Sequence, residues 1–128
     1  MNTQPDMAVA VQAADTTAER YYVLEQLRIL QRQIRERITS MVIQRARVEK
    51  FRRSAVTTAR EYYEGLQKDR QDLLRMFSEA RLCLMEVECY DLAQMAGRLH
   101  MGLSRFDLMS CAYKPVYDAI VGFVERFP

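Results

Sequence analysis

The sequence predicts an all-α protein made of long amphipathic, coiled-coil-like helices that form an elongated helical hairpin or bundle. Glycine and proline are absent from Asp6 to Glu64, and apolar residues recur there at helical spacing. Alternating apolar and polar runs bounded by turn residues, which would indicate strands, are missing. A continuous helix over residues 17–64 would span about 72 Å, whereas a compact chain of this size has a radius of gyration near ~14 Å. The first helix must therefore project towards partner chains, or break and fold back.

The first long helix is predicted over about residues 17–55. Residues 1–15 are small and polar without a sustained period, so they are predicted to form a flexible tail. Thr16 and Glu19 have the spacing of a capping box, which marks a helix start near residue 17. Small and β-branched residues at 54–58 favour a break there. Gly65 is the rival breaking point, although one glycine inside a helix costs only about 1 kcal/mol relative to alanine.

A second long helix is predicted over about residues 58–96, followed by two short ones. Apolar residues face nearly every side between Leu82 and Ala96, which is typical of a buried helix. Ser104 offers an N-cap for a short helix over about 104–112. Pro115 disfavours a helical residue before it and suits a first helical turn, which predicts a last helix over about 115–126. Residues 16–128 are thus predicted to form a single helical domain.

The apolar stripe of the first helix is the predicted surface for partner proteins. Its width suits either a core-facing or a coiled-coil surface, and arginines on one flank would set orientation against acidic groups. Replacing Leu30 and Ile34 by aspartate would then abolish association without unfolding the rest. The sequence leaves homo-oligomer and hetero-oligomer open. The predicted partner-binding residues are Leu27, Leu30, Ile34, Ile38 and Met41, with Arg28, Arg32 and Arg35.

Catalytic, cofactor and metal sites are not predicted. The sequence contains no P-loop, no G-x-G-x-x-G, no H-E-x-x-H and no calcium loop. His100 is the only histidine, and Ser104 follows it by one turn, but the glycines at 97 and 102 leave a nucleophile geometry unset. Cys83 and Cys89 lack C-x-x-C spacing and would lie about 120° apart on a helix, which favours structural cysteines over zinc ligands.

These observations predict a non-enzymatic scaffold or adaptor subunit that assembles with partner helices in an intracellular complex. One alternative is a nucleic-acid-associated accessory protein that uses the arginine-rich face of the first helix against phosphates, through Arg28, Arg32, Arg35, Lys50 and Arg53. The other is a helical chaperone that holds a client in a methionine-rich groove. A formal net charge of +2 favours protein partners over nucleic acid.

The predicted location is the cytoplasm, with the nucleus as the alternative, and secretion is not expected. Three cysteines form an odd count that does not suggest a disulfide framework. The N-terminus lacks a signal peptide, and no apolar run approaches the roughly 20 residues of a membrane span.

Overall fold

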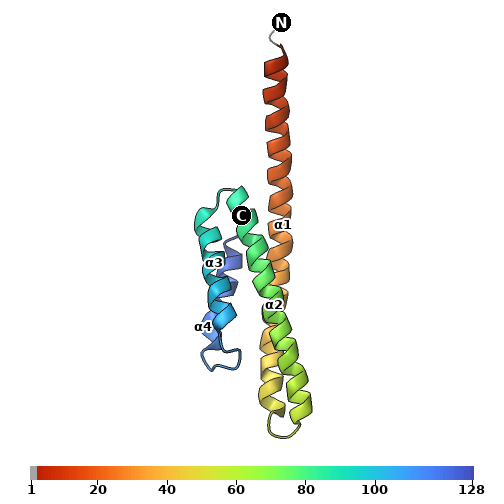
Figure 1. The fold of residues 1–128 in the computed structure, drawn as a ribbon, viewed down its shortest axis with the longest axis vertical. Coiled ribbons are helices and arrows are strands. Elements are labelled where there is room, and N and C mark those ends of the chain that lie inside the picture. Colours follow the sequence, from red (N-terminus) through yellow and green to blue (C-terminus); the bar gives the residue numbers. More distant parts are fainter. Residues whose placement is uncertain (1–2) are drawn as a thin grey trace.

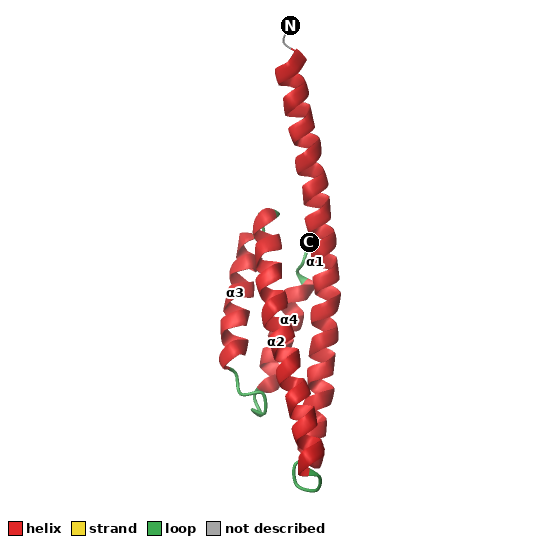
Figure 2. Ribbon diagram, turned by 45° about the vertical axis from the view of Figure 1, so that its right-hand side comes forward, coloured by secondary structure: helices red, strands yellow, loops and turns green. Residues whose placement is uncertain are grey.

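The computed structural model describes residues 3–128, with side chains from Thr17 onward, and contains four helices. They are α1 (Thr3–Phe51), α2 (Val56–Glu86), α3 (Tyr90–Arg105) and α4 (Tyr113–Glu125). Helices α1 and α2 form a long antiparallel hairpin, and α3 and α4 lie along one side of it (Figures 1 and 2). No strand occurs within residues 3–128, so the all-α prediction and the hairpin are confirmed. None of the described helices is long and apolar enough to cross a membrane.

Helix α1 begins well before the predicted start. Residues 1 and 2 lie outside the described residues, but residues 3–15, predicted as a tail, are the first turns of α1 and project beyond the other helices (Figure 1). The sequence there is rich in alanine, the best helix former. Pro5 lies in the first turn, where its missing N–H removes no helical hydrogen bond.

The hairpin turn falls where the small and β-branched residues predicted it. Helix α1 ends at Phe51 and α2 begins at Val56. The backbone N–H groups of Ser54 and Ala55 both donate to the carbonyl of Phe51, at 3.2 and 2.9 Å. Gly65 therefore lies inside α2 and does not interrupt the helix.

The predicted helix over 58–96 is wrong, because α2 ends at Glu86 and α3 starts at Tyr90. Glu88 adopts φ 62°, the left-handed conformation that ends a helix. The N–H of Cys89 donates to the carbonyl of Leu84 (2.8 Å), and the N–H of Glu88 donates to that of Met85 (3.1 Å). These two bonds make a Schellman motif, in which glycine usually occupies the left-handed position. Because this position holds a glutamate and not a glycine, the sequence contains no local pattern that marks the end of α2.

Replacing Glu88 by glycine is expected to stabilise the fold by about 1 kcal/mol, because only glycine adopts the left-handed conformation without steric cost. The midpoint of urea unfolding, followed by circular dichroism, measures the change. Glu79→Gly, at an exposed position inside α2, is the matched control and should destabilise by about 1 kcal/mol. Equal effects of the two variants would contradict the left-handed assignment.

The C-terminal helices also differ from prediction. The predicted helix over 104–112 is wrong, because α3 continues through Gly97 and Gly102 to Arg105, and a loop follows. Burial of one face of α3 outweighs the weak helix propensity of its glycines. The N–H of Met109 donates to the Asp107 carboxylate (3.0 Å), which stabilises a turn in the loop. Helix α4 has Pro115 in its first turn, as predicted.

One hydrophobic core joins all four helices. Phe77 of α2 and Phe123 of α4 are 0 and 1% exposed, and their rings meet edge to face with centroids 6.1 Å apart. Helix α4 thus covers the apolar side of the hairpin, while α3 packs chiefly on α2. The core leaves the turn of the hairpin and the N-terminal part of α1 outside the four-helix region (Figures 1 and 2).

Candidate functional site

The five apolar residues predicted to bind a partner lie inside the core of this chain. Their exposed fractions run from 0 to 6%. They share one cluster with residues of α2, α3 and α4, so in this fold a partner helix does not reach them. The stripe is the core-facing side of a helix that folds back, which corrects the predicted partner contact. These residues are Leu27, Leu30, Ile34, Ile38 and Met41.

The three predicted arginines are exposed on α1. Arg28 pairs with Glu25 on the same helix at 2.8 Å. Arg32 and Arg35 line a shallow cavity of ≈ 380 Å³ with Gln31 and Glu36. One cation of the predicted set is therefore paired with a carboxylate of its own helix, and Glu36 lies beside the other two.

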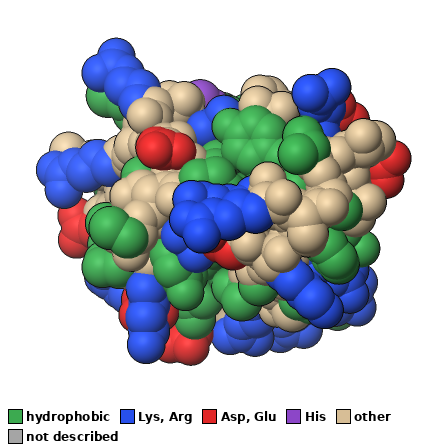
Figure 3. All heavy atoms as spheres, turned by 90° about the horizontal axis from the view of Figure 1, so that it is seen from below, with side chains coloured by type: hydrophobic (Ala, Val, Ile, Leu, Met, Phe, Trp, Pro, Cys, Tyr) green, Lys and Arg blue, Asp and Glu red, His purple; other side chains and the backbone are tan. Residues whose placement is uncertain are grey.

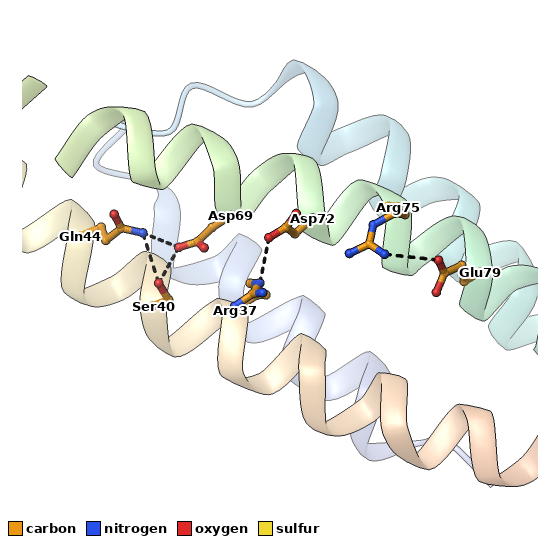
Figure 4. Close-up of polar contacts among 7 residues, drawn as sticks. All are labelled: Arg37, Ser40, Gln44, Asp69, Asp72, Arg75 and Glu79. Atoms are coloured by element: carbon orange, nitrogen blue, oxygen red, sulfur yellow. Dashed lines mark hydrogen bonds and ion pairs between the residues drawn. The ribbon is translucent and has the colours of Figure 1, made fainter. Parts of the chain in front are cut away.

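A buried polar network holds α1 against α2 (Figure 4). Asp69 is 7% exposed and is the only buried charged residue among those whose side chains are described. Its carboxylate accepts hydrogen bonds from Ser40 Oγ (2.6 Å) and Gln44 Nε2 (2.5 Å). A Cβ on Gly65 would lie 1.8 Å from Gln44 Oε1, so glycine makes room for this side chain. Hydrogen bonding offsets the cost of burying the carboxylate, and the network fixes the register of the hairpin.

A second polar cluster attaches α4 and its preceding loop to α1. The Arg45 guanidinium lies 3.8 Å from the centroid of the Tyr113 ring. Its Nη2 donates to the carbonyls of Met109 (3.3 Å) and Ser110 (3.0 Å). Burial raises the pKa of the nearby Tyr117 hydroxyl, with Arg45 opposing that rise, and this hydroxyl is buried without a hydrogen-bond partner. These contacts position α4 and its preceding loop against α1.

Tyr117→Phe is expected to leave stability at pH 7 unchanged or raise it by up to about 1 kcal/mol, because the lost hydroxyl has no partner. The fold favours the neutral phenol, so the unfolded chain releases this proton first. The raised pKa adds to the free energy of unfolding only while the phenol is neutral. This addition is fully present below the ordinary pKa of about 10 and is lost as pH rises through the raised pKa of the folded state. The wild type should therefore lose stability relative to the variant above about pH 10. Urea unfolding at pH 7 and pH 10.5 measures this, and a pH-independent difference would contradict it.

The residues considered for catalysis or metal binding do not assemble. Ser104 Oγ donates to the carbonyl of Met101 (2.7 Å), and the Asp107 carboxylate accepts from the loop backbone, so neither is paired with His100. Burial, followed by Glu86 and Glu79, raises the pKa of the Cys83 thiol, which keeps it protonated and weakly nucleophilic. Among the described residues, no group of three His, Cys, Asp or Glu side chains could hold a metal ion.

Several cavities among the described residues have the volume of a small molecule, and two of them bear on ligand binding. The larger of these two, of ≈ 750 Å³, lies between residues 18–23 of α1 and the end of α2, and its carboxylates are Glu19, Glu86 and Glu88. All its polar lining residues, including Tyr22, are exposed. The second, of ≈ 310 Å³, is an apolar groove between α3 and α4. Its apolar lining is aliphatic and contains no methionine, which does not fit the predicted methionine-rich groove.

A strongly basic surface lies at the turn of the hairpin. We define the basic tip as five exposed cations on the end of α1, the turn and the first turns of α2: Arg47, Lys50, Arg52, Arg53 and Arg60. Beside them the rings of Phe51 and Tyr62 stack, with centroids 6.0 Å apart and planes inclined by 14°.

Sequence reasoning found Lys50 and Arg53 of the basic tip but missed its other members. Residues 44–60 contain six cations, Arg45 included, and one carboxylate, Glu49. This local excess was readable in the sequence. It was overlooked because it crosses the end of one helix and the start of the next, where a single-helix wheel does not show it.

Comparison with known protein families assigns this chain to a family and corrects its predicted function. The model of a family described as an uncharacterised methyltransferase family (DUF6094) matches residues 14–128. No match was found among curated proteins or among solved structures. The prediction of a non-enzymatic scaffold is therefore wrong, since the matching family is described as one of enzymes. The P-loop, G-x-G-x-x-G and H-E-x-x-H motifs are all absent from the sequence, so its residues alone did not indicate an enzyme.

Proposed function

The chain belongs to the uncharacterised methyltransferase family DUF6094, and from this premise we propose that it is the helical portion of a methyltransferase. In this proposal it presents the methyl acceptor, while another polypeptide segment encloses the methyl donor. The single observation that carries the family assignment is the match over residues 14–128, which covers all four helices apart from the first turns of α1. The division of labour rests on how poorly the described cavities suit an adenosyl donor.

S-adenosylmethionine, the methyl donor implied by a methyltransferase, does not fit the described residues. Nucleotide groups in α/β folds are held at the carboxyl ends of parallel strands, beside a glycine-rich turn. Residues 3–128 are helices and connecting loops. The cavity of ≈ 750 Å³ is large enough, but its polar lining is solvent-exposed, whereas binding pockets bury most of the ligand surface. The groove between α3 and α4 is mainly apolar and offers few partners for a ribose and an adenine.

The fold nevertheless suits the presentation of a substrate. The core and the network around Asp69 hold α1 against α2, and the turn of the hairpin extends from this packed region. Surfaces positioned by rigid elements hold reactants at a defined distance and orientation, which accelerates transfer by lowering the entropic cost of the reaction. Under this proposal the chain increases the rate of methyl transfer by positioning the acceptor. The transfer itself takes place where donor and acceptor meet.

The proposal is tested by labelling and by transfer. The tagged full chain is purified from its native cells with its bound partners, and the sample is irradiated with S-adenosyl-[methyl-³H]methionine. The label should attach to a copurifying polypeptide, not to this chain, and the assembly should transfer methyl groups to an acceptor from the same cells. The control is the isolated full chain produced alone, which should show neither labelling nor transfer.

Two results would overturn this proposal. One is donor binding and methyl transfer by the isolated chain, which would place both substrates on the described helices. The other is a purified assembly that contains this chain and transfers no methyl groups to any extracted protein, nucleic acid or small-molecule fraction.

A further inference from the structure

We infer that the basic tip binds the phosphate backbone of a nucleic acid, which makes nucleic acid the acceptor class of the proposed methyl transfer. This inference rests on the proposed function for the reaction and on the geometry of the hairpin for the contact. The tip lies at the free end of the hairpin, beyond α3 and α4, where an extended polymer can approach it (Figures 1 and 2).

Four of the five cations of the basic tip are available to meet phosphates. Arg52 pairs with Glu49 at 3.3 Å. The other four members of the basic tip form no ion pair with any described carboxylate. Glu61 and Glu64 follow on α2, yet with them residues 44–64 still hold six cations against three carboxylates. Viewed from below, this end of the molecule shows Lys and Arg side chains across its surface and rim (Figure 3).

Aromatic rings lie among these cations. Arg47 sits 5.2 Å from the centroid of the Tyr62 ring, and Lys50 sits 5.3 Å from that of Phe51. Each ring contacts the charged group itself, which orients that group, while both cations stay exposed at the surface. Four of the five cations of the tip are arginines, whose planar guanidinium groups bind phosphate oxygens in pairs. Positioned arginines beside aromatic rings suit a nucleic-acid backbone and its bases.

Acidic residues at the other end of the hairpin direct a polyanion towards the basic tip. Residues 79–91, at the opposite end of α2, carry four acidic side chains and one basic side chain. The charged lining of the cavity there consists of three carboxylates, Glu19, Glu86 and Glu88, and one cation, Arg20. A polyanion is repelled at that end and attracted at the tip, so it should approach the hairpin turn first.

A nucleic acid fits the tip better than an acidic protein does. Specific protein interfaces have a buried apolar centre, whereas the two rings of the tip are half-buried against each other and Val56 is the one large apolar side chain exposed beside the turn. Nucleic-acid binding requires no such centre, because release of counterions from the phosphates supplies most of the non-specific affinity.

The test uses the full chain and fluorescence anisotropy with three fluorescein-labelled probes: a single-stranded DNA, its duplex and the RNA of the same sequence. The variant Lys50→Ala/Arg53→Ala/Arg60→Ala removes three unpaired cations of the tip. Its matched control, Arg28→Ala/Arg32→Ala/Arg35→Ala, removes three exposed arginines from the flank of α1. All six positions are exposed, so circular dichroism should show an intact fold for both variants.

The wild type should bind at least one of the three probes, and its affinity should fall as salt rises. The tip variant should bind tenfold or more weakly at about 50 mM salt, and its logarithmic salt dependence should be shallower by about 2–3. The control variant should stay within about threefold of the wild type.

Three results would overturn the inference: no binding of the wild type to any probe, an unchanged affinity of the tip variant, or an equal loss in the control variant. Binding of a labelled polyglutamate peptide in place of all three nucleic acids would instead assign the tip to an acidic protein. The purified assembly separates the two proposals. If it methylates a protein and not a nucleic acid, the inference fails and the proposed function stands. If the tip binds nucleic acid while the assembly transfers no methyl groups, the proposed function fails and the tip assignment stands.

Discussion

The double replacement Leu30→Asp/Ile34→Asp is expected to unfold the chain. Leu30 is 4% exposed and Ile34 is 0% exposed, and both belong to the common core. Removing a buried leucine or isoleucine side chain costs roughly 2–5 kcal/mol, before the added cost of burying an unpaired carboxylate. The total therefore matches or exceeds the roughly 5–15 kcal/mol by which a domain of this kind is stable. From the sequence alone, this variant would be expected to stay folded and to lose only its association with a partner. The burial of both residues predicts unfolding instead.

Circular dichroism at 222 nm and thermal melting measure this prediction. The variant should lose most of its helical signal at 25 °C and show no cooperative transition. The double replacement Arg32→Asp/Arg35→Asp introduces the same residue on the exposed flank of the same helix and should keep a cooperative melt. A cooperatively folded core variant that fails only to associate would restore the partner-surface interpretation of the stripe.

Phe123→Ala is expected to destabilise the protein by about 3–5 kcal/mol, because it removes a buried aromatic ring and leaves a cavity. The Phe123 ring meets Phe77 of α2 at 6.1 Å and Phe127 at 5.0 Å between centroids, both edge to face. It therefore links α4 to the hairpin as well as to the C-terminal end. Urea unfolding followed by circular dichroism measures the loss.

A double-mutant cycle with Phe77→Ala separates the ring contact from simple burial. The coupling should be about 0.5–1.5 kcal/mol, the usual contribution of an aromatic pair beyond its buried area. Val121→Ala, at a half-buried position on the same helix, is the control and should cost less than about 1 kcal/mol. A loss below about 1 kcal/mol for Phe123→Ala would mean that α4 does not pack on the hairpin as described.

The helical class and the hairpin turn follow from local sequence. Long stretches free of glycine and proline, with apolar residues at helical spacing, leave helices as the structure that can bury one face. The weak helix formers at 54–58 overlap the observed turn, which spans residues 52–55, and Pro115 lies in the first turn of α4. These features act within a few residues of one another, which is why one sequence reveals them.

The C-terminal boundaries and the use of the apolar stripe depend on distant residues. Glu88 adopts a conformation usual for glycine because the helices on both sides of it are packed in place. Gly97 and Gly102 remain helical because the buried face of α3 packs on α2. Gly65 makes room for Gln44, which is far away in sequence. No local pattern contains this information.

The sequence likewise reveals one part of the candidate site and not another. The cations around the hairpin turn are visible in the sequence, and their clustering needs only the turn between α1 and α2. Membership of a methyltransferase family left no signal in the composition or motifs, because the helices carry no glycine-rich phosphate loop and no catalytic set.

By itself, the sequence determined that this protein is helical, where its hairpin turns and where its positive charge gathers, since backbone propensity and charge are local properties. The tertiary structure alone decided that the stripe of α1 is a core and not an interface. It also decided where α2 gives way to α3. Both outcomes depend on which apolar faces find each other, and that choice is made by packing among residues far apart in the chain.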